Sequence, residues 1–437
     1  MLARLLPLYF ESVDEEFYRQ VENLKVLLSA EAEIMEPVAL GSAIPEAEAV
    51  VFPQLLGEIY RKFKYIKTIR LPILIITSEF CTLSMWDWEI INFLQSEGIP
   101  TLAPYTLEQA RNICKGLAVK RDLRQAKLLV FQDNPGKGFQ ASIFKRFYWW
   151  EDECTQRMVE KYGITIVKKS LQELGVRIKA FSDQEAQQVW QQWSLKTEGV
   201  SKPALFSAIK LYLAIRDELD QDEQIRGVGI NCLNESHFLD TTPCLAWNIL
   251  HEERRLIWGC EGDTLSMLTL FILRNSLQIP IMMTNLYPFL LGQAALKHER
   301  IPDFPDIPQP ENCILVAHCG YLGVLPVSLS IEWMLRPKVL AIVDPNATAI
   351  DARLPVGEIT LAKLDATLKR MTVVEGALEN YVQYPGSDCI NGGIIRVADG
   401  HRLMRGLSSH HYLLMTGHHR VDIEILSKIF ELEVEAI

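Results

Sequence analysis

Two carboxylates are the residues best suited to chemistry, and both stand in the stretch Trp258-Gly-Cys-Glu-Gly-Asp-Thr264, between an apolar run and a predicted helix. Glu261 and Asp263 therefore occupy a strand-to-helix turn. Acids at such a turn can simply cap the helix, because they accept backbone N–H groups and favour the positive end of the helix dipole. The alternative is a site shared with the second turn of the same unit, Met282-Met-Thr-Asn-Leu-Tyr-Pro288.

Histidines supply the second group of candidates. His318 ends an apolar strand, where sites of parallel sheets form, but a buried histidine is also often a hydrogen-bonded core residue. Five of the nine histidines lie within nineteen residues, from position 401 to position 419. His410 and His411 alternate faces if their run is extended, so we expect at most one of them in a given cleft. The last pair, at positions 418 and 419, follows a turn and is expected in solvent or at an interface.

Carboxylate and imidazole groups from separate segments make up the ligand set of a Mn²⁺, Co²⁺ or Zn²⁺ site. The sequence contains no HxH or HExxH spacing. Spacing alone therefore does not show that these candidates converge on one site, and their position in the fold has to decide it.

Two further features could contact a ligand. The loop Asp133-Asn-Pro-Gly-Lys-Gly138 lies between a predicted strand and an aromatic helix, and it is either a plain turn or a cradle for an anion on backbone N–H groups. It lacks the Lys-Ser/Thr ending of a P-loop, and no GxGxxG is present. Trp86, Trp88 and the pair Trp149-Trp150 could stack on a sugar, although such aromatic residues are more often core or interface residues.

Strands and helices alternate through the first 300 residues. Leu71–Thr77 is continuously apolar, as strands of parallel sheets are, and the pattern restarts at Lys127–Phe131. We therefore predict an α/β protein with two doubly wound, Rossmann- or flavodoxin-like domains. The predicted domains are residues 1–126 and residues 127–300, and the second carries the Glu261 turn.

The composition changes after residue 300. The Pro-rich segment Arg300–Pro310 is expected to be a semi-rigid crossover. Short strands separated by turn signals follow, at residues 313–317, 339–343, 358–364, 371–378, 393–398 and 412–416. They predict a β-rich, barrel-like domain over residues 301–437, with a final helix at residues 421–430.

Composition limits the class of protein. A net charge of −11 over 437 residues argues against a general nucleic-acid binder, which needs clustered Lys and Arg. The most apolar stretch, Ile314–Leu335, is interrupted by His, Gly, Pro and Glu, which a membrane-spanning helix would not tolerate. Nine cysteines occur singly, without a CxxC pair, which suits a reducing compartment. We therefore expect a soluble, cytoplasmic protein.

Several of these stretches together resemble the L-fucose isomerase and L-arabinose isomerase superfamily. The resemblance rests on Glu261-Gly-Asp opening a helix, Met283-Thr-Asn, Ala317-His-Cys and Ser409-His-His-Tyr. It is strengthened by Pro243-Cys244, Leu354-Pro-Val-Gly-Glu-Ile-Thr360, Val374-Glu-Gly376 and the run His410–His418. It covers about residues 225–437, and the short fucose-isomerase-like subgroup is the most similar.

The resemblance implies two doubly wound domains, a C-terminal β domain and a bound divalent metal, usually Mn²⁺. Members of the superfamily interconvert aldoses and ketoses. By position, Glu261 is similar to the metal-binding glutamate that also acts as acid and base. His411 resembles the C-terminal histidine ligand, and His318 resembles an additional histidine of the arabinose-isomerase branch.

The sequence departs from the superfamily at the second acid, whose position is taken by Asn285. An Asn amide oxygen can coordinate a metal, but it carries no charge and is no general base. Asp263, Glu235, His237 or a metal-bound hydroxide are the alternatives for the missing group. A second departure is Asp388-Cys-Ile, where related proteins often carry Cys-Arg, so the sugar contacts are expected to differ.

We therefore expect a metal-dependent aldose–ketose isomerase that works by an enediol-type proton transfer, with Glu261, Asp263 and Asn285 as catalytic candidates. The expected metal ligands are Glu261, Asn285, His318 and His411. One alternative is an isomerase of an anionic, 6-substituted hexose, for which Lys137, Lys145 and Arg146 are basic candidates. Another is a sugar-binding relative that has lost catalysis with Asn285.

The substrate-binding candidates are Trp86, Trp88, Lys137, His237 and His410. The resemblance also implies a homo-oligomer whose active sites lie near subunit interfaces, so that Trp86, Trp88 or the Lys137 loop reaches a neighbour's site. The expected partner is a small-molecule sugar, with no nucleic acid and no membrane.

Overall fold

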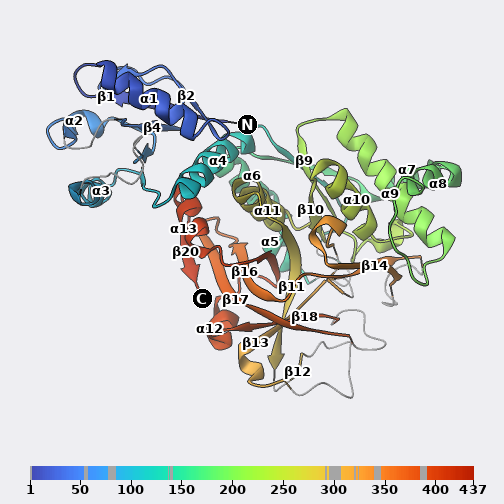
Figure 1. Cartoon of the computed structure of the whole chain (residues 1–437). Helices are drawn as coiled ribbons and strands as arrows, with labels where there is room; N and C mark the ends of the chain where they lie inside the picture. The colour runs from blue at the N-terminus through green and yellow to red at the C-terminus, as the bar shows by residue number, and fades with distance from the viewer. Residues whose placement is uncertain are drawn as a thin grey trace. The chain divides into compact units, whose positions relative to one another are not determined.

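The computed structural model describes residues 2–53, 58–76, 85–135, 137, 141–290, 293–294, 307–318, 321–322, 324–338, 346–383 and 391–437, with backbone only at 85–88, 290 and 293–294. The predicted strand at 339–343, most of the crossover and the stretch 388–390 lie outside these residues. The chain folds into two compact units (Figure 1). Met1–Leu123, Ile272–Gln278 and Val421–Glu433 form the first unit, and Arg124–Phe271, Ile279–Arg420 and Val434–Ile437 form the second.

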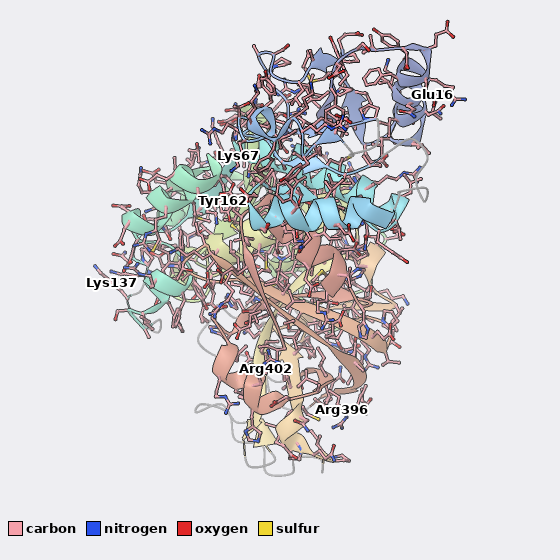
Figure 2. The ribbon with its side chains drawn as sticks, turned by 90° about the vertical axis from the view of Figure 1, so that its left-hand side faces the viewer. Glu16, Lys67, Lys137, Tyr162, Arg396 and Arg402 are labelled. Atoms are coloured by element: carbon pink, nitrogen blue, oxygen red, sulfur yellow. The ribbon has the colours of Figure 1, made fainter. Side chains whose placement is uncertain are left out.

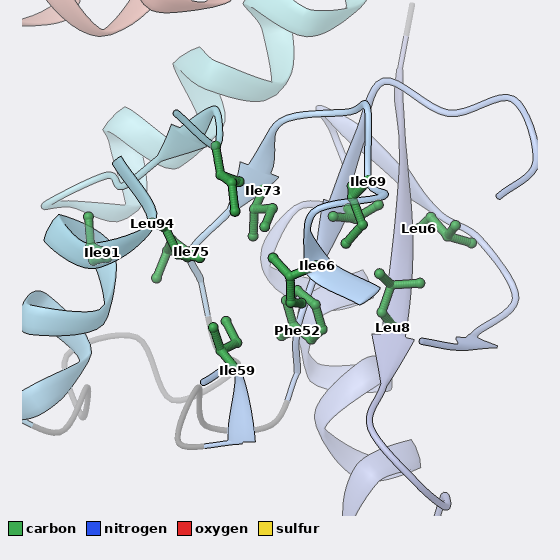
Figure 3. Packing of buried hydrophobic residues seen from close by; sticks show 12 residues of the cluster. Leu6, Leu8, Phe52, Ile59, Ile66, Ile69, Ile73, Ile75, Ile91 and Leu94 are labelled. Carbon is green, nitrogen blue, oxygen red and sulfur yellow. The ribbon is translucent and has the colours of Figure 1, made fainter. Parts of the chain in front are cut away.

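The first unit contains a parallel sheet of order β2-β1-β4-β5-β6, with β3 paired to β1. Its strands are β1 (Ala3–Tyr9), β2 (Ala32–Ile34), β3 (Val38–Ala39), β4 (Ala49–Val51), β5 (Ile73–Leu74) and β6 (Thr101–Leu102). Its helices are α1 (Glu15–Leu27), α2 (Phe63–Ile66), α3 (Met85–Ser96), α4 (Leu107–Leu123) and α13 (Arg420–Ile429). The apolar residues of β1, β4, β5 and β6 are mostly buried. Side chains of β1, β4 and β5 meet those of the helices in one apolar cluster, as Figure 3 shows for residues such as Leu8, Ile73 and Leu94.

The last helix, α13, belongs to this first unit, although it is predicted as the end of the third domain. Gly116 of α4 explains the close packing. A Cβ atom at this glycine would lie 2.6 Å from Leu426 and 2.9 Å from Ile429 of α13. Lys120 of α4 also donates a hydrogen bond to the carbonyl oxygen of Ile429, which satisfies an acceptor at the end of α13.

The second unit begins with a parallel sheet of order β10-β9-β7-β8. Its strands are β7 (Lys127–Phe131), β8 (Thr165–Lys169), β9 (Ile225–Ile230) and β10 (Ile257–Cys260). The helices around it are α5 (Phe144–Phe147), α6 (Asp152–Tyr162), α7 (Leu171–Ala180), α8 (Asp183–Trp190), α9 (Lys202–Gln221), α10 (Cys244–Arg254) and α11 (Thr264–Leu277), with the 3₁₀ turn η2 (Ser236–Phe238). Both sheets thus confirm the predicted parallel α/β architecture.

A closed antiparallel barrel of six strands completes the second unit. Its order is β11-β13-β18-β17-β16-β19, and β19 pairs back to β11. These strands are β11 (Ile281–Leu290), β13 (Cys313–Ala317), β16 (Gly357–Leu364), β17 (Arg370–Val382), β18 (Gly392–Val397) and β19 (His411–Thr416). The remaining elements are β12 (Gln293–Ala294), β14 (Glu332–Pro337), β15 (Thr348–Arg353), β20 (Glu433–Ala436), α12 (Gly400–Gly406), η3 (Pro310–Asn312) and η4 (Val327–Leu329). The predicted barrel in the C-terminal region is confirmed.

β11 is a strand of the barrel, although it lies before the domain boundary that is predicted at residue 300. It pairs antiparallel with β13 and β19, not with the parallel sheet that precedes it. A strand of parallel type and a barrel strand are both short apolar runs, so periodicity does not distinguish them. The pairing places Asn285 directly opposite His411.

Among the described residues, no helix combines the length and apolar character that crossing a membrane requires.

Candidate metal centre

Glu261 directly follows β10 and takes an unusual backbone conformation. Its φ is 54° and that of Gly262 is 68°, so two successive residues are left-handed. Only glycine fits the second position, since a Cβ atom there would lie 3.1 Å from Nε1 of Trp150, which donates a 2.8 Å hydrogen bond to the Gly262 carbonyl oxygen. The first position is costly for a glutamate, by roughly 1–3 kcal/mol. Tertiary contacts therefore hold the Glu261 carboxylate, of which 10% is exposed, in a defined place.

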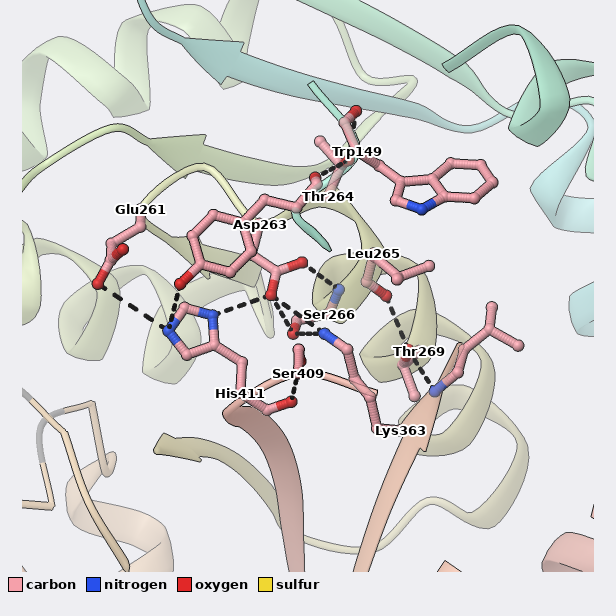
Figure 4. A network of polar contacts seen from close by, with 12 residues as sticks. Trp149, Glu261, Asp263, Thr264, Leu265, Ser266, Thr269, Lys363, Ser409 and His411 are labelled. Atoms are coloured by element: carbon pink, nitrogen blue, oxygen red, sulfur yellow. Dashed lines mark hydrogen bonds and ion pairs between the residues drawn. The ribbon is translucent and has the colours of Figure 1, made fainter. Parts of the chain in front are cut away.

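Asp263 caps α11 and also anchors the site, as Figure 4 shows. One carboxylate oxygen accepts the backbone N–H of Ser266 at 2.7 Å, which confirms the capping interpretation. The other accepts hydrogen bonds from the Ser266 hydroxyl at 2.7 Å, from Nζ of Lys363 at 3.1 Å and from Nδ1 of His411 at 2.9 Å. Lys363 also donates to the Ser266 hydroxyl. This network joins the start of α11 to barrel strands β16 and β19.

The network keeps Asp263 ionised although it is completely buried. Burial by itself raises the pKa of a carboxyl group, but the charge of Lys363 and then the hydrogen bond from His411 outweigh it, and the pKa of Asp263 lies well below its ordinary value. Burial conversely lowers the pKa of Lys363, and the charge of Asp263 opposes this shift. Asp263 is thus a positioning residue, and its four hydrogen bonds make it a poor substitute for the missing second acid.

Asp263 determines how His411 presents its ring. Nδ1 of His411 lies 2.9 Å from the Asp263 carboxylate, and Nε2 lies 4.0 Å from the Glu261 carboxylate. In the neutral ring, donation from Nδ1 leaves the lone pair on Nε2, on the side of Glu261. The ring of Tyr148 stacks on His411, with a centroid distance of 4.7 Å and an interplanar angle of 5°. A carboxylate that orients a histidine through its second nitrogen is a common arrangement around metal ligands.

His410 joins the same cluster. Its ring centroid lies 4.5 Å from that of His411, and its Nε2 lies 3.0 Å from the hydroxyl of Tyr148. One ligand atom from each of Glu261, His410 and His411 falls within 4.8 Å of the others. The prediction that only one histidine of the pair enters a given cleft is wrong. The alternation of an extended strand does not apply, because β19 begins at His411 and His410 lies in the bend before it.

The environment keeps His410 neutral. Burial, and then the neighbouring His411, lower the pKa of His410 well below the ordinary 6.5. The unfolded chain takes up a proton at about pH 6.5, whereas the folded protein does not until a lower pH, so stability falls as the pH falls through this window.

For metal-free protein we expect acidification from about pH 7.5 to about pH 5.5 to cost the wild type about 1 kcal/mol more folding free energy than the His410→Gln variant. Urea unfolding at the two pH values measures the difference. Equal losses in both proteins would contradict a partly buried His410 that stays neutral.

Asn285 lies beside the cluster. Directly paired residues of antiparallel strands project their side chains to the same face, so Asn285 shares a face with His411. Its amide nitrogen donates to the Tyr287 hydroxyl at 2.8 Å. Its Oδ1 is buried and has no hydrogen-bond partner among the described residues. A buried, unsatisfied carbonyl oxygen beside a His/Glu cluster is what an additional metal ligand would look like before the ion binds.

Replacement of Asn285 by Asp is expected to raise Mn²⁺ affinity at least about tenfold, because a second carboxylate adds charge next to Glu261 and His411. Calorimetric titration of the metal-stripped protein measures the effect. The Asn380→Asp variant, in β17, controls for a general effect of added charge. An unchanged affinity would place Asn285 outside the ligand shell.

His318 lies near the cluster but does not belong to it. Its buried ring stacks against His411 with a centroid distance of 5.5 Å, and it contributes no atom to the three-residue group. The structure therefore supports His410, predicted as a substrate contact, as a ligand candidate in place of His318.

The remaining candidates are not brought to this cluster. His237 is exposed and packs on Phe238, and Lys137 is exposed at the surface of its unit (Figure 2). Arg146 is paired with Glu151 and Glu153. The side chains of residues 86 and 88 lie outside the described residues. Trp149 and Trp150 are buried and are core residues, not exposed stacking platforms.

Glu235 also has another role. Its buried carboxylate accepts the backbone N–H groups of Asp133 and Asn134 and the side-chain amide of Asn231. Glu235 therefore accepts two backbone N–H groups of the loop 133–138, and these are groups that an anion would have needed. The plain-turn interpretation holds for this part of the loop, and Glu235 is not a substitute acid.

Tyr148 and Lys363 are site residues that the sequence does not predict. Tyr148 is fully buried with its hydroxyl 3.0 Å from His410 and 3.5 Å from His411. Burial, together with the charges of Glu261 and Asp263, raises the pKa of Tyr148 well above its ordinary value, so it stays protonated. The available signals were a tyrosine in the aromatic run 147–150 and a lysine in the apolar strand 359–364.

Neither a protein-family model nor a curated protein matches the chain. The geometry of the cluster is therefore the basis for a functional proposal.

The donor set fits a divalent transition metal. One carboxylate and two neutral imidazoles are typical ligands of Zn²⁺, Mn²⁺ or Co²⁺. His410 is held neutral, and the Nε2 lone pair of His411 is fixed by Asp263. Oδ1 of Asn285 offers a fourth donor atom, an oxygen, on the same face as His411.

Proposed function

We propose that this protein is a metal-dependent aldose–ketose isomerase whose ion is held by Glu261, His410 and His411, with Asn285 as a further oxygen donor. The observation that carries the proposal is the buried carboxylate–imidazole cluster, with one imidazole oriented by Asp263. The resemblance of residues 225–437 to the fucose and arabinose isomerases agrees with it. A bound divalent ion, such as Mn²⁺, would polarise the sugar carbonyl and so acidify the adjacent C–H group.

Glu261 is the group that moves the proton in this proposal. Its carboxylate takes the proton from C2 of the open-chain aldose and returns it to C1, through an enediol-type intermediate. The proton of the 2-hydroxyl group passes through solvent to the carbonyl oxygen at C1, so that a ketose forms. One carboxylate is sufficient when the same group removes and returns the proton. The Asn at position 285 then changes the charge of the site without removing a required base. Asp263 and Lys363 hold His411 in place and take no part in the transfer.

The substrate class is an unmodified sugar rather than an anionic one. Lys137 is exposed, Arg146 is paired with acids, and neither belongs to the cluster. We further propose a homo-oligomer, on the resemblance alone, and a soluble cytoplasmic setting, on the composition and the cysteine usage.

The test is isotope exchange. Metal-stripped protein is reloaded with Mn²⁺ and incubated in D₂O with a panel of pentoses, hexoses and deoxyhexoses, and deuterium at C2 and ketose formation are followed by NMR. We expect exchange with at least one sugar and none with the Glu261→Gln variant. Metal binding without exchange would favour a non-catalytic sugar-binding protein. The absence of a second acid at position 285 is the observation that supports this alternative. Absence of both metal binding and exchange would refute the proposal.

A further inference from the structure

Two cysteines that are 28 residues apart in sequence meet beside the candidate metal centre. The Sγ atoms of Cys232 and Cys260 are 3.5 Å apart, and both side chains are buried. Cys260 is the last residue of β10, and the register pairs it with Ile230 of the neighbouring strand β9. Cys232 lies two residues beyond that partner, and its N–H donates to the Ile230 carbonyl oxygen at 2.8 Å. The two thiols thus meet at the carboxyl end of the parallel sheet.

Buried cysteines commonly serve as small apolar core residues, and a single one would imply nothing more. Here the sulfur atoms already contact each other, on backbone segments that the β9–β10 pairing holds together. A disulfide bond is about 2.05 Å long, so closure requires the sulfurs to approach by about 1.5 Å. Rotation of the side chains with a small backbone shift can provide this movement.

We propose that Cys232 and Cys260 are a modification site at which a hydroperoxide closes an intramolecular disulfide bond. In the first step one thiolate attacks the peroxide oxygen, the O–O bond breaks, and a sulfenic acid and water (or an alcohol) form. In the second step the other thiol attacks the sulfenic sulfur, the S–O bond breaks, and a second water leaves with the thiol proton. Two thiols and one hydroperoxide give one disulfide, and the peroxide is the oxidant that is reduced.

Access to the thiols depends on local opening at the end of β9. Cys232 lies outside the strand, and the following residues Leu233 and Asn234 are partly exposed. Loop segments of this kind open more readily than the centre of a sheet, and hydrogen peroxide is small enough to enter through such an opening. Cys260, inside β10, then acts as the resolving partner.

The disulfide would act on the residue that follows Cys260. Glu261 keeps its carboxylate 4.0 Å from Nε2 of His411 through a strained, left-handed backbone conformation. Movement of Cys260 toward Cys232 changes the direction in which the chain enters that turn, and it displaces the carboxylate from the two histidines. Oxidation is therefore expected to weaken metal binding. This consequence rests on the proposed metal centre, whereas the disulfide itself does not.

The experiment uses the full-length protein exposed to hydrogen peroxide and then to N-ethylmaleimide. Peptide mapping by mass spectrometry without reduction is expected to find Cys232 linked to Cys260. Mn²⁺ affinity, measured by calorimetry, should fall at least about tenfold and return after treatment with dithiothreitol. The Cys232→Ser variant should keep its affinity through the same treatment, and the Cys114→Ser variant, which removes a buried thiol of α4, should respond as the wild type does.

Two results would overturn the inference. One is a peptide map in which other cysteines are oxidised while residues 232 and 260 remain as separate thiols. The other is a complete disulfide that leaves Mn²⁺ affinity unchanged, which overturns the effect on Glu261. If the reduced protein binds no Mn²⁺, the proposed function fails, and the peptide map still decides on the disulfide.

Discussion

The Lys363→Met variant is expected to lose about 3–5 kcal/mol of folding free energy, because it leaves the Asp263 carboxylate buried and without its cation. Both side chains are 0% exposed in the wild type, so water cannot replace the lost partner. Met fills most of the volume of the lysine stem, which makes the lost charge the main change. Chemical denaturation of the metal-free protein gives the size of the effect.

A second substitution distinguishes this electrostatic effect from damaged packing. In the Lys363→Met background, Asp263→Asn removes the stranded charge, so the double variant should be more stable than the single one by at least about 1 kcal/mol. The matched control is Lys369→Met, which removes an exposed lysine after the same strand and should change stability by less than about 0.5 kcal/mol. A double variant less stable than Lys363→Met would show that the lysine acts through packing alone.

The single Asp263→Asn variant tests the role of the Asp263–Lys363 pair in the metal centre. Asp263 fixes the tautomer of His411 only while it is ionised, and Lys363 is the cation that keeps it so. NMR of the histidine ring nitrogens should therefore show His411 with its proton on Nδ1 in the wild type and a mixture of tautomers in the Asp263→Asn variant. Loss of packing would not change the tautomer in this way.

The sequence predicts the architecture well where one signal dominates. Uninterrupted apolar runs such as Leu128–Phe131 correctly indicate parallel strands with both faces covered. Turn-separated short strands after residue 310 correctly indicate a barrel. The assignment of β11 fails because an apolar run carries no information about whether its partner strand is parallel or antiparallel. Only the pairing with His411 and Ala317 reveals it.

The residues of the candidate site likewise differ in how well the sequence predicts them. Glu261 and His411 are predicted through the resemblance, since residue types and spacing alone leave a capping role for Glu261 and do not choose between His410 and His411. His410 is misjudged, since alternation applies only inside a strand and β19 begins one residue later. Tyr148 lies 263 residues from His411 and Lys363 lies 100 residues from Asp263, and both belong to elements whose sequence is typical of ordinary core. Such long-range polar contacts depend on tertiary packing, which no local pattern encodes.

Mn²⁺ is expected to stabilise the wild-type protein by about 2.7 kcal/mol when its free concentration is a hundred times the dissociation constant, because only the folded state brings the ligands together. The Glu261→Gln variant should lose nearly all of this increment. It keeps the shape of the side chain but removes the negative charge from a cluster whose other ligands, His410 and His411, are imidazoles. Thermal unfolding with Mn²⁺ and with EDTA measures the difference.

The control is Glu108→Gln, an isosteric change at an exposed residue in the first turn of α4, and it should preserve the full stabilisation by Mn²⁺. A response of Glu261→Gln equal to that of the control would mean that Mn²⁺ binds elsewhere. Because Gln also removes the proposed base, stability separates the two roles of Glu261. If the Glu261→Gln variant is still stabilised by Mn²⁺ but no longer catalyses isotope exchange, Glu261 is a base and not a metal ligand. Loss of both is the outcome expected if one carboxylate holds the ion and moves the proton.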